Sequence, residues 1–210
     1  MAGAGGGAGG GPRLYLIAPA RFGADDPDRV ARLLDGFDVA CVRLALPAAS
    51  EDDVARAADA LRPACHARDV PLVVADHFRL APRLGLDGVH LTDGARQVRA
   101  VRTALGADAI VGAFCRASRH DGMTAAEIGA DYVSFGPVGA TGLGDGTLAD
   151  PELFAWWSEM IEIPVVAEGA LTPELAATLG GTADFLAVGP EIWQADEPAA
   201  ALRELIAPLG

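Results

Sequence analysis

Short apolar runs alternate with amphipathic segments along most of the chain. Eight of these runs have the composition of buried β-strands, at residues 13–19, 39–46, 71–76, 87–91, 109–115, 131–137, 164–170 and 184–190. Most of them are continuously apolar, which is typical of a parallel sheet covered on both faces. Helical spacing separates them, at residues 26–37, 50–69, 95–106, 121–129, 151–161, 172–181 and 197–209, with a short Pro-containing helical turn at 79–85.

Capping signals support this division into elements. Ser50 and Asp53 have the spacing of a capping box, and Thr172 followed by Pro173 is a typical helix start. Eight strands in strict alternation with eight helical segments predict an α/β fold, a single (β/α)8 TIM barrel over residues 13–210. The absence of a GxGxxG motif after the first strand argues against an open dinucleotide-binding sheet. The first 12 residues, MAGAGGGAGGGP, predict a flexible tail.

The composition of the chain limits which classes of molecule it is expected to bind. The 16 basic residues are all Arg, and they face 29 acidic residues, which gives a formal net charge of −13. Such a chain would be repelled by nucleic acid and by anionic membrane surfaces, and it has no apolar run of membrane-spanning length. Three isolated cysteines and no recognisable secretory signal predict a reduced, cytoplasmic protein. The oligomeric state stays open, with a homo-oligomer as one option.

The chemistry of a TIM barrel lies at the carboxyl ends of its strands, and glycines mark several of these ends. Gly136, Gly169 and Gly189 lie at the ends of predicted strands, and the positive end of the helix after Thr172 points to the region of the last two. We therefore expect a phosphate group to bind near these backbone N–H groups, although such glycines also simply make turns. Because the chain contains no Lys, any positively charged side chain that contacts a phosphate must be an Arg or a His. Arg116 and Arg119 lie close behind the fifth strand.

Charged residues inside apolar strands are a second signal. Arg43 and Glu168 would be costly to bury alone, so we expect them either to pair with each other or to contact a substrate. Asp76 and Asp93 follow neighbouring strands and have the oxygen ligands that Mg²⁺ prefers, while an N-cap role is the alternative for Asp76. His90 is expected to be a satisfied structural histidine.

Several segments, in chain order, resemble the thiamine-phosphate synthase and thiazole tautomerase superfamily. They are LYLIAP (14–19), Arg43, VVADHFRLAPRLGLDGVHL (73–91), GADYVSFGPVGAT (129–141), PVVAEGA (164–170) and FLAVGPEI (185–192). The resemblance implies a (β/α)8 barrel whose synthase members join a pyrimidine-methyl diphosphate to a thiazole phosphate and release pyrophosphate. It also implies Mg²⁺ at the leaving pyrophosphate and a phosphorylated small-molecule substrate.

Several of the family's motif positions hold a different residue in this chain. The family has a Gln-x-Arg-x-Lys motif on the second strand, and residues 41–45 of this chain retain only its arginine, as Arg43. The family's Asn-Asp-Arg motif is Ala75-Asp76-His77 in this chain, so only the aspartate is retained. The family's second metal-binding aspartate corresponds to about Ala95 in this chain, so the nearby Asp93 is the candidate to replace it. Thr141 remains without the Lys that follows in the family, and the two phosphate motifs become Gly169-Ala170 and Gly189-Pro190.

We therefore assign catalytic roles to Arg43, His77, Thr141 and Glu168, and phosphate or substrate binding to Arg116, Arg119, Gly136, Gly169 and Gly189. Asp76 and Asp93 are the predicted Mg²⁺ ligands. The first hypothesis is a thiamine-phosphate synthase. The alternatives are a metal-independent thiazole tautomerase or other isomerase of a phosphorylated ligand, and a non-catalytic barrel that binds thiamine phosphate or its precursors.

Overall fold

Eight parallel strands follow one another in chain order around a closed barrel. They are β1 (Arg13–Ile17), β2 (Val39–Leu44), β3 (Leu72–Ala75), β4 (Gly88–Leu91), β5 (Ile110–Phe114), β6 (Tyr132–Phe135), β7 (Val165–Glu168) and β8 (Phe185–Val188). The computed structural model describes residues 11–210, so the predicted tail lies outside the described residues except for its last two positions. The predicted (β/α)8 barrel is confirmed.

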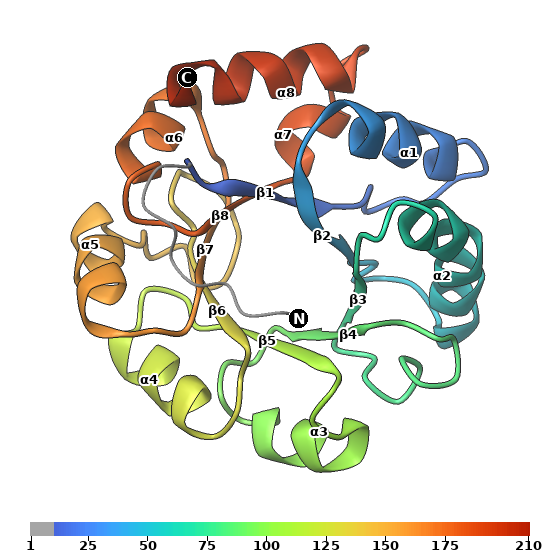
Figure 1. Cartoon of the computed structure of the whole chain (residues 1–210), viewed down its shortest axis with the longest axis horizontal. Helices are drawn as coiled ribbons and strands as arrows, with labels where there is room; N and C mark the ends of the chain where they lie inside the picture. The colour runs from blue at the N-terminus through green and yellow to red at the C-terminus, as the bar shows by residue number, and fades with distance from the viewer. Residues whose placement is uncertain (1–10) are drawn as a thin grey trace.

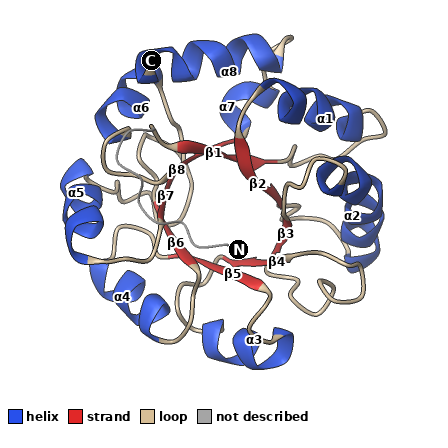
Figure 2. Cartoon of the chain, viewed as in Figure 1, coloured by secondary structure: helices blue, strands red, loops and turns tan. Residues whose placement is uncertain are grey.

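Helices form a ring around the strands (Figures 1 and 2). They are α1 (Asp26–Gly36), α2 (Glu51–His66), α3 (Val98–Leu105), α4 (Arg119–Glu127), α5 (Pro151–Met160), α6 (Pro173–Leu179), α7 (Pro190–Trp193) and α8 (Pro198–Ile206), followed by the 3₁₀ turn η1 (Ala207–Leu209). The predicted caps are present, because Ser50 and Asp53 form a reciprocal capping box and Thr172 Oγ1 accepts from the Leu175 N–H. None of the helices in residues 11–210 has both the length and the apolar character needed to cross a membrane.

Two connections differ from the predicted alternation. The segment at 79–85 forms turns rather than a regular helix, and Figure 2 draws the link between β3 and β4 as loop. Pro82 lacks an N–H donor, and a segment this short gains too few hydrogen bonds to offset the cost of starting a helix. Conversely, the four-residue helix α7 follows β8, where no separate helix is expected from the sequence.

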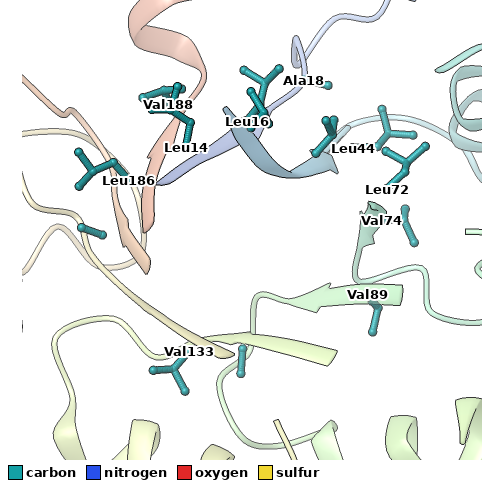
Figure 3. Packing of buried hydrophobic residues seen from close by; sticks show 14 of the residues in the cluster. Leu14, Leu16, Ala18, Leu44, Leu72, Val74, Val89, Val133, Leu186 and Val188 are labelled. Carbon is teal, nitrogen blue, oxygen red and sulfur yellow. The ribbon is translucent and has the colours of Figure 1, made fainter. Parts of the chain in front are cut away.

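Apolar side chains of the strands divide into an outer and an inner set. Alternate residues such as Leu16, Leu44, Val74, Val133 and Val188 point outward and pack under the helices (Figure 3). A smaller inner cluster fills the barrel with Tyr15, Cys41, Val73, Ile110, Tyr132, Val166 and Ala187. The inner set includes two tyrosines, so the lumen of the barrel contains polar groups beside its apolar filling.

Aspartates at the start of three even-numbered strands fix the pairing with the strand before. Asp87, Asp131 and Asp184 directly precede β4, β6 and β8, and each accepts from a backbone N–H near the start of the preceding odd strand. The distances are 2.8 Å to Leu72, 2.7 Å to Val111 and 2.8 Å to Val165. These bonds lie at the amino-terminal end of the barrel, opposite the end where a TIM barrel places its active site.

Candidate active site

A cleft of about 1100 Å³ opens at the carboxyl ends of β1, β2, β7 and β8 and beneath the loop after β6. Four of the predicted site residues line it: Arg43, Thr141, Glu168 and Gly169. They come from the end of β2, the loop after β6 and the end of β7, and a site built from several strand ends is the usual construction of a TIM-barrel active site. We take this cleft as the candidate active site.

Arg43 and Glu168 form a buried ion pair at the floor of the cleft. Arg43 Nη2 donates to Glu168 Oε2 at 2.7 Å, and Ser134 Oγ donates to the other carboxylate oxygen at 3.1 Å. Burial by itself would lower the pKa of the Arg43 guanidinium, but Glu168, together with Tyr15 and Tyr132, holds that pKa above its ordinary value. Of the two roles expected for these residues, mutual pairing is therefore the one found, and the pair carries no net charge.

A chain of hydrogen bonds crosses the lumen below this pair. The hydroxyl groups of Tyr15 and Tyr132 are 2.7 Å apart, and the Tyr132 hydroxyl lies 3.0 Å from His90 Nδ1. Burial raises the pKa of both tyrosines and, with the Arg43 charge, lowers that of His90 well below its ordinary value. All three side chains are therefore uncharged at neutral pH.

Two buried nitrogens of the lumen make no hydrogen bond. Within residues 11–210, His90 Nε2 and Arg43 Nε are enclosed and lack a partner. The expectation of a fully satisfied structural His90 is thus met at one ring nitrogen only. Because buried polar groups are normally paired, these nitrogens mark the lumen as able to receive a polar ligand atom or a water.

Asp76 and Asp93 lie at the ends of β3 and β4 and do not line the cleft. Asp76 accepts from the Thr92 N–H at 2.8 Å and from Thr92 Oγ1 at 2.6 Å, so its carboxylate does not cap the turn that follows it. Asp93 accepts from Gln97 Nε2 at 3.0 Å, while its Oδ1 is buried without a partner. Thr92, the residue before Asp93, therefore links Asp76 to the end of β4. His77 follows Asp76 and is half-buried.

The two predicted phosphate-binding arginines have different surroundings. Arg116 is exposed beside the glycine-rich loop after β6, where its Cγ lies 3.7 Å from the position that a Cβ on Gly144 would take. The guanidinium carbon of Arg119 lies 4.6 Å from the ring centroid of Trp156 on α5. Arg116 is thus placed at the mouth of the barrel, whereas Arg119 is placed in the helix layer.

The predicted glycines are explained by close packing and backbone conformation. A Cβ on Gly136 would come within 2.2 Å of the Glu168 carbonyl oxygen, and one on Gly189 within 2.8 Å of Ile17 Cβ. Gly169 has a φ of 93°, in the region that favours glycine. These glycines bring neighbouring strand ends close together around the cleft.

The backbone N–H groups at the ends of β7 and β8 already face an anion. Glu191 Oε2 accepts from the Gly189 N–H at 2.9 Å, and its Oε1 accepts from the Leu171 N–H at 3.3 Å. A phosphate that accepted from the same two donors would have to displace the Glu191 carboxylate.

Left-handed backbone recurs at the same end of the barrel. Asp76, Arg116 and Ala170 have φ values of 57°, 53° and 55°, and each follows an odd-numbered strand. Non-glycine residues rarely adopt this conformation, and where it is found it often accompanies a functional site. Its recurrence at three strand ends agrees with the placement of the site there.

Comparison with known proteins decides the family. The sequence matches the family described as thiamine monophosphate synthase over residues 14–192. It is 46% identical over 199 residues to the thiamine-phosphate synthase of Rhodospirillum centenum, covering 91% of this chain and 95% of that protein. It is 40% identical over 194 residues to the synthase of Erythrobacter litoralis, covering 90% and 91%.

The chain belongs to the thiamine monophosphate synthase family.

Solved structures agree with this assignment at the level of fold. A thiamine phosphate pyrophosphorylase from Pyrococcus furiosus superposes with a TM-score of 0.81 at 24% identity, covering 94% of this chain and 95% of that one. The family model and the two synthase relatives confirm the family resemblance inferred from the sequence segments.

Several residues of the site in this family member are not among those expected from the sequence. Tyr15, Tyr132 and Ser134 face the lumen, but in the sequence they occupy ordinary positions of apolar strands. Arg21, Arg29, Glu191 and Trp193 also line the cleft, from the loop after β1 and from α1 and α7. Arg21, Glu191 and Trp193 lie shortly after a strand end, so their position is the only signal in the sequence, whereas Arg29 lies within α1 and has no such signal.

Proposed function

We propose that this protein is a thiamine-phosphate synthase. In this reaction the bond between the pyrimidine methylene carbon and the diphosphate oxygen breaks, and the thiazole nitrogen forms the new carbon–nitrogen bond. Thiamine phosphate and pyrophosphate are the products. The similarity to the Rhodospirillum centenum synthase over 91% of the chain carries this proposal.

The cleft supports the proposal through its shape and its donors. Departure of a diphosphate group is favoured by positive charge and by fixed hydrogen-bond donors, with little covalent work for the protein. Arg43 lies at the floor of the cleft with its Nε unpaired, and Thr141 and Gly169 supply a hydroxyl and a backbone N–H at its rim. The Arg43–Glu168 pair keeps the floor electrically neutral, so a cationic intermediate would not face an isolated positive charge there.

The Mg²⁺ ion that the family implies would need oxygen ligands, and the carboxylates that follow β3 and β4 are the candidates, although both oxygens of Asp76 already accept from Thr92. Residues 11–210 contain no group of three or more His, Cys, Asp or Glu side chains arranged to hold a metal. Mg²⁺ usually takes only one or two carboxylates together with substrate phosphates and waters, and Asp93 Oδ1 is a buried acceptor without a partner. We propose Asp76 and Asp93 as its protein ligands. When bound, the ion would neutralise charge on the leaving diphosphate.

Complementation tests the proposed activity in a cell. A bacterial strain that lacks its own thiamine-phosphate synthase is given this chain and plated without thiamine. We expect growth with the wild-type chain and none with Arg43→Ala, at equal amounts of folded protein. Failure of the wild-type chain to restore growth, when a known synthase does so, would contradict the proposal.

A further inference from the structure

Three arginines and two carboxylates line the cleft, namely Arg21, Arg29, Arg43, Glu168 and Glu191. Arg43 is compensated by Glu168 at 2.7 Å. Arg29 is compensated by Asp26, also at 2.7 Å, and its guanidinium carbon lies 5.1 Å from the ring centroid of Trp193. Both arginines therefore already have a carboxylate partner before any ligand enters.

Arg21 is different. It lines the same cleft from the loop after β1 and is exposed. Within the part of the chain that the structure describes, it takes part in none of the ion pairs, side-chain hydrogen bonds or ring contacts. The β2 side of the cleft adds only the uncharged Ala45 and Pro47 beyond Arg43. Among the described arginines of the cleft, Arg21 is thus the one without a carboxylate partner, and the Glu191 carboxylate, which also lines the cleft, accepts from backbone N–H groups instead.

The loop that carries Arg21 is held in place. Asp26 is 5% exposed and accepts from the Gly23 N–H at 2.8 Å, while its own N–H donates to the Gly23 carbonyl at 3.3 Å. Phe22, next to Arg21, packs against the hydrophobic core. A backbone ordered in advance loses less entropy when a ligand binds, so Arg21 is suited to a binding role.

We propose that Arg21 binds the phosphoryl oxygens of the substrate in this cleft. A guanidinium group matches phosphate oxygens with two parallel hydrogen bonds, and this one has no internal partner to give up. The net charge of −13 makes a local cation more important, because the molecule as a whole repels anionic ligands. The inference rests on the proposed function, which supplies a diphosphate on one substrate and a monophosphate on the other.

Titration calorimetry with inorganic pyrophosphate and with inorganic phosphate tests the inference on the full chain. The variants are Arg21→Ala, Arg21→Lys and the matched control Arg32→Ala, which removes an exposed arginine of α1 outside the cleft. We expect Arg21→Ala to weaken binding of at least one anion by about tenfold or more, Arg21→Lys to lose less, and Arg32→Ala to stay within about twofold. A loss confined to pyrophosphate would assign Arg21 to the diphosphate, and a loss confined to phosphate would assign it to the monophosphate.

The inference is wrong if Arg21→Ala binds both anions like the wild type, or if the wild type binds neither anion at millimolar concentrations. Arg21 is exposed, so equal melting temperatures for the variants would show that folding is not the cause of any loss. Failure of the proposed function is a separate result: a wild type that forms no thiamine phosphate would overturn that function. The anion titrations would still decide the role of Arg21.

Discussion

At the scale of single residues, the Arg43–Glu168 pair has the greatest influence on the site. Both side chains are buried, at 7% and 1% exposure, and each charge depends on the other for compensation. Removing one member would leave the other charge buried alone, which is far more costly than the pair itself. The pair therefore links the stability of the fold to the geometry of the cleft.

We predict that Glu168→Gln lowers the free energy of unfolding by about 3–5 kcal/mol, because Arg43 loses its carboxylate partner. Urea unfolding followed by circular dichroism measures this loss. The double variant Arg43→Met with Glu168→Leu is the control, and it should recover most of the stability while remaining inactive. A loss below about 1 kcal/mol for Glu168→Gln would mean that the pair is not buried as described.

The three cysteines give a second prediction, on pH and reactivity. Burial raises the pKa of Cys65 and Cys115 to about 12, and that of Cys41 well above its ordinary value. A raised thiol pKa means that the reactive thiolate is scarce at pH 8, whereas an unfolded thiol has a pKa of about 8.5. We expect the native protein to resist an aromatic disulfide reagent at pH 8 and all three thiols to react in denaturant. Rapid reaction of one thiol in the native protein would contradict the burial.

The sequence predicts some of these residues and misses others for physical reasons. A charge in an apolar strand is conspicuous because burying it alone is costly, so Arg43 and Glu168 can be recognised without a structure. Tyr15 and Tyr132 cannot, because tyrosine is common in ordinary strands. Arg21 lies in a loop without periodicity, where only the three-dimensional fold reveals that it faces the cleft.

At the scale of elements, the barrel separates stability from chemistry. The aspartates that precede β4, β6 and β8 bind backbone groups at the amino-terminal end of the barrel. The strained residues and the cleft lie at the opposite end. Variants at the two ends should therefore have different consequences.

We predict that Asp131→Ala lowers stability by about 1–3 kcal/mol, because the Val111 N–H and Arg102 both lose their acceptor. The turnover number of the folded protein should stay within about twofold of the wild type, since the bond lies away from the cleft. Thermal unfolding and a turnover assay below the melting temperature measure the two effects. Asp108→Ala, an exposed aspartate nearby in sequence, is the control and should change neither. Loss of turnover with unchanged stability would place Asp131 in the active site instead.

The elements themselves follow largely from the sequence. Eight apolar runs and the capping residues at Ser50 and Thr172 correspond to observed strands and helix starts. The link between β3 and β4 and the short helix α7 are the exceptions, because brief segments rich in turn residues carry little periodic signal.

At the scale of the whole molecule, an acidic barrel has to attract substrates that are themselves anionic. The net charge of −13 opposes their approach. Local positive charge in the cleft and a divalent cation at the β3 and β4 ends would offset this repulsion for a phosphorylated ligand.

Metal removal tests that part of the account. We predict that excess EDTA abolishes product formation and that added Mg²⁺ restores it. Asp76→Ala should raise the Mg²⁺ concentration needed for half-maximal rate by about tenfold, because a carboxylate ligand is lost. Asp108→Ala again serves as the control. An unchanged rate in excess chelator would remove Mg²⁺ from the mechanism.

The most direct test of the central claim is product formation by the purified protein. The pyrimidine-methyl diphosphate and the thiazole phosphate are mixed with the enzyme and Mg²⁺, and thiamine phosphate and pyrophosphate are both quantified. The account predicts equal amounts of the two products, and none above background with Arg43→Ala. A folded wild type that binds pyrophosphate yet forms no thiamine phosphate would contradict it.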